Sequence, residues 1–335
     1  MTEFRVLQLA TSPRSFFTQQ VTALEARGVE CTTVTVPRPT GEGESGRSPR
    51  EYARFYADVL HEGFGSYDLV HANYGLVGPV ALAQPTRPVV LTLWGSDVMG
   101  PAWLRRVTVA AARRSDAVIA PSRPLARELP VPHHYIPFGV DTDLFRPIDR
   151  AASRERVGWD PDARIVLFPY ETDRAVKNYD LAARVVEGVR AGSNAEVGGN
   201  RGNGESDRGD GGDGSDGGGV DVELKAVSGV AYEEMPYYMN ASDALLVTST
   251  RESGPMVVRE AAACNVPVVS TSVGFVPDVL AGVENSVVAD SEADLVAGLE
   301  SVLASDGRSN GRAVVTGLGV DEMADRLLAV YRGVC

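Results

Sequence analysis

Short apolar runs alternate with amphipathic stretches along most of the chain. The runs are rich in Val, Ile and Leu and are bounded by polar or turn-forming residues, which is typical of buried strands. The stretches between them carry apolar residues three and four positions apart, which predicts helices. We predict strands at 4–10, 30–36, 67–72, 89–93, 115–121, 164–169, 220–227, 244–247 and 266–269, and helices at 16–27, 51–64, 181–189, 232–240, 255–264, 290–303 and 321–334. This alternation predicts an α/β fold.

The length of 335 residues is enough for two domains. Prolines and glycines give the segment 135–147 a stiff, turning character between the two sets of strands. Residues 192–219 are dominated by Gly, Asp, Asn and Ser, so they cannot supply a core, and we predict a disordered insertion there. Its Asp-Gly repeats lack the nine-residue period of calcium-binding repeats, so that interpretation is rejected.

The chain is strongly acidic, with 45 acidic against 32 basic residues and a net charge of −13. Such a surface repels nucleic acid and anionic lipid, so no nucleic-acid partner is expected. We interpret the excess as adaptation to high salt in a halophilic microbe, and a merely acidic protein is the alternative. Cys31, Cys264 and Cys335 are too far apart for a disulfide framework or a zinc site, which fits a reducing compartment.

No apolar stretch has the ~20 residues that cross a bilayer, and no signal peptide is evident, so we expect a cytoplasmic protein. One helix leaves a peripheral contact with the inner face of the membrane open. Residues 51–64 carry an aromatic stripe, which either touches lipid or a lipid-linked acceptor or packs on the sheet.

The stretch 249–271 carries the clearest chemistry. Gly254 frees the turn before a helix, and Pro255 suits the first helical position. Glu252 and Glu260, eight positions apart, interrupt an otherwise apolar stretch, where a carboxylate is unfavourable unless it is paired or binds a ligand. The N-terminus of the helix also favours an anion such as phosphate. The alternative is that Glu260 pairs with an arginine and Glu252 is solvated.

The block around this stretch, residues 237–280 (YYMNASDALLVTSTRESGPMVVREAAACNVPVVSTSVGFVPDVL), resembles a known signature. It is similar to the E-x7-E motif of the retaining glycosyltransferases that include sucrose synthase and bacterial mannosyltransferases. The segment 135–147 resembles the P-x-G-V-D-x-x-x-F-x-P link between the two domains of that family. The resemblance implies a GT-B fold, with Rossmann-like domains at 1–145 and 146–319 facing across a cleft and a final helix in 320–335 that returns toward the first domain.

By this resemblance the second domain binds a nucleotide-sugar donor. Glu260 would bind the ribose, Arg174 and Lys177 the diphosphate, and Glu252 the transferred sugar. The remaining donor-binding residues implied are Gly229, Val230, Gly254, Pro255 and Met256. No Asp-x-Asp motif is evident, so we expect no metal and no cofactor besides the donor.

On the acceptor side, the resemblance points to His71, Trp94, Ser96, Asp97 and Arg14. Two positions depart from the family pattern: Asn73 replaces a histidine, and Trp94 stands where histidine is common and could stack on a sugar ring. Arg14 either contacts an anionic acceptor or is solvated.

The implied activity is retaining transfer of a sugar, expected to be a hexose, to a carbohydrate, lipid-linked or small-molecule acceptor. Two alternatives stay open. One is a non-catalytic sugar-nucleotide-binding subunit, which the changes at Asn73 and Trp94 favour. The other is a sugar-nucleotide epimerase of the same fold. The sequence does not distinguish UDP from GDP and does not identify the sugar, the acceptor or the oligomeric state.

Overall fold

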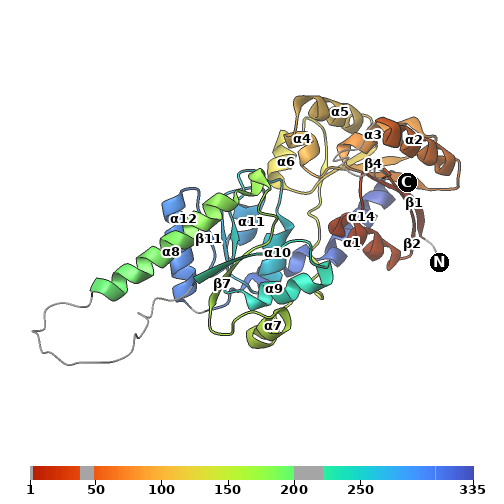
Figure 1. Ribbon diagram of the computed structural model, residues 1–335. Coiled ribbons are helices and arrows are strands. Elements are labelled where there is room, and N and C mark those ends of the chain that lie inside the picture. Colours follow the sequence, from red (N-terminus) through yellow and green to blue (C-terminus); the bar gives the residue numbers. More distant parts are fainter. Residues whose placement is uncertain (1–2, 38–48, 200–221, 306) are drawn as a thin grey trace, which may run out of the picture. The chain divides into compact units, whose positions relative to one another are not determined.

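The chain forms two compact units (Figure 1). The structure is a computed structural model that describes residues 3–37, 49–199, 222–305 and 307–335. The first unit contains Met1–Thr142, Glu252–Pro255 and Thr316–Cys335, and the second contains Asp143–Arg251 and Met256–Val315. Each unit is described by itself.

The first unit is built on a six-stranded sheet in the order β2-β1-β3-β4-β5-β6. Every strand pairing in it is parallel. The strands are β1 (Phe4–Ala10), β2 (Val29–Thr35), β3 (Leu69–Asn73), β4 (Val89–Thr92), β5 (Ala117–Ala120) and β6 (His134–Tyr135). The chain runs from β1 outward to β2 and returns to β3 on the other side of β1, so the strand order reverses between β1 and β3.

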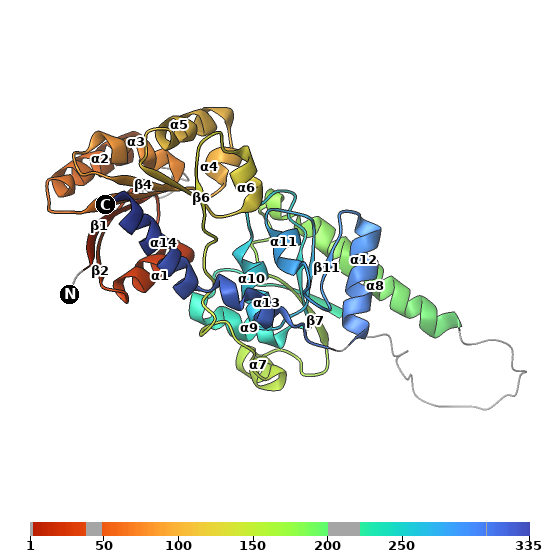
Figure 2. The same cartoon turned by 180° about the vertical axis from the view of Figure 1, so that it is seen from behind.

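Helices cover both faces of this sheet (Figures 1 and 2). On one face α1 (Ser15–Glu25) lies beside α14 (Val320–Val334). On the other face lie α2 (Pro49–Gly63), α3 (Gly78–Ala83) and α5 (Ala102–Ala112), with η1 (Gly75–Val77) and the short helices α4 (Ser96–Met99) and α6 (Arg123–Glu128). Burial on both faces explains why the inner strands β1, β3, β4 and β5 are largely apolar.

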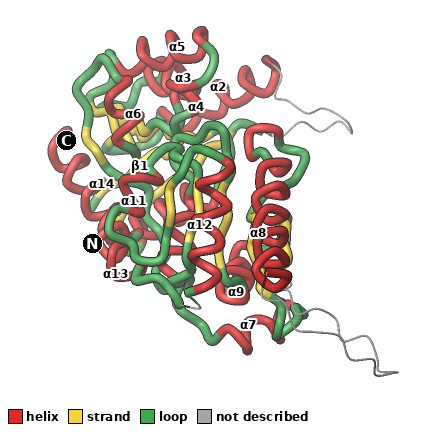
Figure 3. The backbone as a smooth tube through the Cα atoms, turned by 90° about the vertical axis from the view of Figure 1, so that its left-hand side faces the viewer, coloured by secondary structure: helices red, strands yellow, loops and turns green. Residues whose placement is uncertain are grey.

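The second unit repeats this architecture with a five-stranded parallel sheet in the order β11-β10-β9-β7-β8. Its strands are β7 (Arg164–Phe168), β8 (Val222–Ala226), β9 (Ala244–Val247), β10 (Val268–Ser270) and β11 (Val287–Val288). Its helices are α7 (Arg150–Val157), α8 (Tyr179–Gly199), α9 (Met235–Ala241), α10 (Met256–Ala263), α11 (Val276–Leu280), α12 (Glu292–Ala304) and α13 (Gly311–Val315). Figure 3 shows α8 beside α12.

The strand order also reverses in the second unit, between β7 and β9. Ligands of open α/β sheets bind at the carboxyl ends of the strands beside such a reversal. The loops that follow β7, β8 and β9 contain Arg174 and Lys177, Gly229 and Val230, and Glu252 respectively. The topology therefore singles out the loops in which the sequence places the donor-binding residues.

The predicted α/β class is confirmed, and each predicted strand has a counterpart within a few residues. One prediction about the insertion needs correction. Helix α8 continues to Gly199, so residues 192–199 are helical rather than disordered. Extending an existing helix by one residue costs little free energy compared with starting a new helix. Residues 200–219 lie outside the described residues. No described helix is long and apolar enough to cross a membrane.

Candidate functional site

Lys177 is a buried cation at the carboxyl end of β7. It ends the short helix η2 (Ala175–Lys177), and only 5% of it is exposed. Its ammonium lies 3.6 Å from the centroid of the Tyr170 ring, a cation–π contact that restrains the long side chain. Arg174 precedes η2 and is exposed. The two cations thus differ in freedom: Lys177 is held in place, and Arg174 can adjust to a ligand.

Hydrogen bonds join the loop after β9 to the loop after β7. The Thr248 hydroxyl donates to the carbonyls of Lys177 and Asn178, both at 3.0 Å. The backbone N–H of Thr250 donates to the carbonyl of Val176 at 3.0 Å. These bonds fix the start of the signature stretch against the Lys177 loop, within the second unit.

Glu260 lies inside α10 and is 5% exposed. The hydroxyl of Tyr232, in η3 (Tyr232–Glu234), donates to its Oε1 at 2.9 Å. Burial raises the pKa of Glu260 to about 7, and the bond from Tyr232 opposes this rise. No arginine among the described residues pairs with Glu260, in contrast to the alternative left open above. The adjacent Arg259 instead lies over the Phe275 ring, 3.9 Å from its centroid.

The turn after β8 holds the predicted donor-binding residues Gly229 and Val230. Gly229 has φ +71°, and no atom lies within 4 Å of where a Cβ would stand. Gly229 is exposed and Val230 is half-buried. The backbone here is therefore open enough for a flat ligand to approach.

The turn before α10 groups with the first unit. Glu252 is half-buried, Gly254 is half-buried and Pro255 is buried. The hydroxyl of Ser253, within the same turn, donates to the carbonyl of Trp94 at 3.0 Å. Met256 begins α10 in the second unit. Lys177 and Glu260 thus belong to the second unit, and Glu252 belongs to the first.

Asp97 organises the loop after β4. Its carboxylate is fully buried and accepts backbone N–H groups of Gly75 (2.8 Å), Trp94 (3.0 Å) and Gly95 (2.8 Å). Burial raises the pKa of Asp97, and the three backbone bonds oppose that rise. Asp97 therefore shapes the predicted acceptor side and is not exposed to an acceptor itself.

His71 is also a core residue, which corrects its expected place at an open strand end. Strand β3 continues two residues beyond it, and its ring is fully buried. Nδ1 lies 2.6 Å from the Tyr331 hydroxyl and Nε2 2.7 Å from the Thr92 hydroxyl. Burial lowers the pKa of His71 to about 3, so the ring is neutral. The nearby Asn73 is buried as well and bonds to Gln8 and Gln20.

The other acceptor-side residues are more accessible. The Trp94 ring is half-buried and packs edge-on against Phe16, with 4.9 Å between the centroids. Ser96 and Arg14 are exposed. No described acid pairs with Arg14, so its guanidinium can receive an anionic group.

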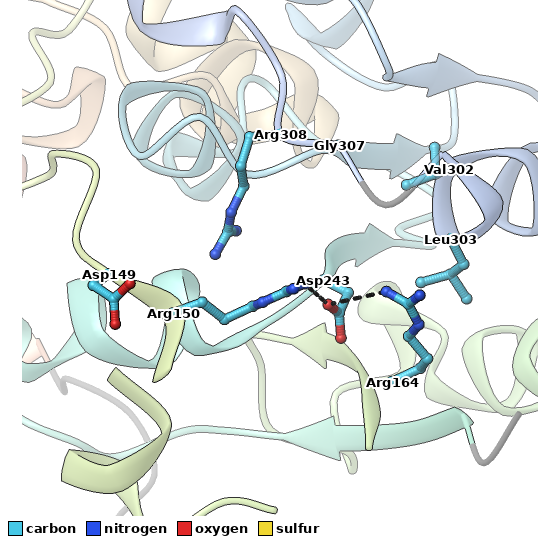
Figure 4. Close-up of a pocket in the computed structure, with 8 residues that line it drawn as sticks. All are labelled: Asp149, Arg150, Arg164, Asp243, Val302, Leu303, Gly307 and Arg308. Carbon is cyan, nitrogen blue, oxygen red and sulfur yellow. Dashed lines mark hydrogen bonds and ion pairs between the residues drawn. The ribbon is translucent and has the colours of Figure 1, made fainter. Parts of the chain in front are cut away.

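A cavity of about 250 Å³ lies elsewhere in the second unit (Figure 4). Arg150, Arg164 and Arg308 surround the buried Asp243, which accepts from Arg150 at 2.5 Å. Asp243 and Arg164 stand at the amino ends of β9 and β7, opposite the loops described above. Within the described ranges, no group of three or more His, Cys, Asp or Glu residues could hold a metal ion.

Two aromatic residues of the site escaped the sequence analysis. Tyr170 follows β7 and contacts Lys177, and Tyr232 bonds to Glu260 from 28 positions away. A tyrosine just after a predicted strand was the only available signal, and it does not identify a partner.

Comparisons with known proteins agree with this architecture. A family described as Glycosyltransferase Family 4 matches residues 9–144, and one described as Glycosyl transferases group 1 matches residues 219–313. The D-inositol 3-phosphate glycosyltransferase of Xylanimonas cellulosilytica is 30% identical, with 84% of this chain and 77% of the relative covered. The chain belongs to the group 1 glycosyltransferases.

A second relative, the D-inositol 3-phosphate glycosyltransferase of Segniliparus rotundus, is 32% identical, with 85% of this chain and 71% of the relative covered. Among solved structures, sucrose-phosphate synthase from Thermosynechococcus elongatus superimposes with a TM-score of 0.73 at 20% identity, covering 98% of both chains. Anabaena HepE in complex with UDP and glucose gives 0.66 at 16% identity, covering 99% of this chain and 100% of the other. The predicted GT-B fold is confirmed.

Proposed function

We propose that this glycosyltransferase moves a sugar from a nucleotide-diphosphate donor to an acceptor hydroxyl with retention of configuration and without a metal. The observation that carries the proposal is that one unit holds both a buried carboxylate, Glu260 in α10, and a buried cation, Lys177, in the loop after β7. A carboxylate accepts two ribose hydroxyls well, and an ammonium suits a phosphate.

Stabilisation of the leaving group drives the reaction. When the anomeric C–O bond breaks, its electron pair leaves with the diphosphate. The acceptor oxygen bonds to the anomeric carbon on the same face of the sugar, and its proton passes to the departing diphosphate oxygen. Lys177 and Arg174 neutralise the growing charge, and a cation already held in place is more effective because little reorganisation is needed. Glu252 orients the transferred sugar beside the backbone of Gly254, Pro255 and Met256. Gly229 and Val230 flank the base.

The comparisons narrow the substrates to be tried first. HepE, similar in fold, was solved with UDP and with UDP-glucose, which makes UDP-sugars the first candidates for the donor. The relatives are named for transfer to D-inositol 3-phosphate, so we propose a phosphorylated polyol as acceptor. The exposed Arg14 is suited to bind the phosphate of such an acceptor.

The test uses the purified full chain with UDP- and GDP-sugars, with and without inositol phosphates, at low and high salt. We expect nucleotide release and a glycosylated product that depend on the acceptor, persist in a chelator and show the donor's anomeric configuration by NMR. No product and no donor consumption with any combination would refute the proposal. Isomerised donor without acceptor would instead support the epimerase alternative.

The two signature glutamates provide matched variants. Glu260→Gln should weaken binding of the bare nucleoside diphosphate, because an amide is a poorer acceptor for two hydroxyls. Glu252→Gln should leave that affinity nearly unchanged and lower turnover, because its proposed partner is the transferred sugar. Calorimetry with UDP beside a transfer assay separates the two roles. Equal effects on both measurements in both variants would contradict the assignment.

A further inference from the structure

Glu260 uses only one of its two carboxylate oxygens within the described structure. Oε1 accepts the bond from Tyr232, and no described residue donates to Oε2. A carboxylate that is nineteen-twentieths buried strongly favours having its remaining lone pairs satisfied, which is what a ligand hydroxyl provides.

The Tyr232 ring is held in place independently of Glu260. It packs edge-on against the fully buried Phe145, with 5.2 Å between the centroids. Phe145 is fixed in turn, since its carbonyl accepts from Arg312 at 2.9 Å. The phenol therefore presents its hydroxyl to Oε1 from a preset position.

We propose that Tyr232 is a positioning residue of the donor site, whose hydroxyl holds Oε1 of Glu260 and thereby directs Oε2 toward the ribose hydroxyls of the donor. This inference rests on the proposed function, since it requires that Glu260 bind a nucleotide. It adds a residue that acts on the chemistry through Glu260.

The effect depends on pH, because burial opposes ionisation of Glu260 and the Tyr232 bond favours it. Burial brings the pKa of Glu260 to about 7 even with that bond in place, so a loss of the bond raises it further. Cys264, directly after the end of α10, stays protonated near neutral pH because burial raises its pKa to about 12. Arg259, on α10, and Arg312, which donates to the carbonyl of Ala263 in α10, are the neighbouring cations. Between Glu260 and Cys264, Glu260 is the group whose pKa lies within the range of pH 6 to 9.

The experiment compares UDP affinity of the wild type and Tyr232→Phe from pH 6 to 9 by calorimetry. The phenylalanine keeps the ring contact with Phe145 and removes only the donor. A hydrogen bond to a charged group shifts its titration by about one pH unit, so we expect UDP affinity to fall roughly fivefold at pH 7 and less than twofold at pH 9. Tyr238→Phe, on α9 against Trp159, is the matched control and should leave the profile unchanged.

Glu260→Gln provides the reference profile, because it lacks the titrating carboxyl at position 260. The pH dependence that remains in this variant comes from UDP, which has a phosphate that itself titrates near pH 6. If Tyr232→Phe lowers UDP affinity equally at all pH values, or does not lower it at all, the inference is overturned. If the wild type fails to bind UDP or GDP at any pH, the proposed function fails instead, and the two failures are distinguishable.

Discussion

Replacing Glu260 by glutamine should make the protein more stable at alkaline pH, relative to the wild type, in the absence of nucleotide. Burial raises the pKa of this carboxyl from 4.5 to about 7. A group with a raised pKa in the folded state contributes stability that is complete below the unfolded value, near 4.5, and is lost as the pH rises through 7. Ionisation of Glu260 therefore lowers the free energy of unfolding of the wild type, and glutamine avoids this loss because it does not ionise.

The magnitude follows from the two pKa values. A rise in pKa from 4.5 to about 7 corresponds to about 3 kcal/mol. The free energy of unfolding of Glu260→Gln, relative to the wild type, should therefore be higher by about this amount at pH 8 or above than at pH 4.5. Glutamine has the same size as glutamate, and its amide oxygen can accept the bond from Tyr232, so packing adds little to this difference.

The assay is urea unfolding of wild type and Glu260→Gln at pH 5, 6, 7 and 8, with the transition of the second unit compared between the two proteins. Glu233→Gln, an exposed carboxylate close to Tyr232 in sequence, is the control and should leave the pH dependence of the wild type unchanged. A stability difference that is the same at pH 5 and pH 8 would show that burial of Glu260 carries no titration penalty and refute the reasoning.

Three further predictions concern other parts of the chain. Lys177→Ala should lower transfer by about 2–4 kcal/mol in transition-state free energy and leave uridine binding unchanged, and a parallel loss of both would make Lys177 structural. Asp97→Asn should lower the free energy of unfolding by about 2–3 kcal/mol, because its amide NH₂ would face backbone donors, whereas unchanged unfolding would show that these bonds are dispensable. Deleting residues 200–219, which contain no aliphatic or aromatic side chain, should preserve soluble protein and UDP binding, and insoluble protein would argue against it.

The positions of most strands along the chain could be predicted because they follow from local pattern, whereas most donor-side residues were implied by the resemblance to a known family. Apolar runs buried on both faces identify parallel strands, and β6 was missed because both of its residues are exposed. Lys177 was implied by that resemblance, and Glu260 stood out because it interrupts an apolar helix.

Partnerships across long sequence distances could not be predicted. His71 looked like a strand-end ligand, and its burial depends on Tyr331, 260 positions away. Asp97 was expected to face an acceptor, whereas three backbone N–H groups converge on it only after the loop has folded. Tyr232 lies near Glu260 because α10 and η3 come together in the second unit, which spacing does not reveal.

The return of α14 to the first unit has a consequence for biosynthesis. Tyr331 is fully buried there against His71 of β3, on the face of the sheet that α14 covers. A ribosome synthesises β1 to β6 first, yet this helix emerges only after the whole second unit has been made. Until translation reaches α14, the part of the apolar face that α1 does not cover stays exposed, and a chain that stops early presents this part to chaperones and proteases.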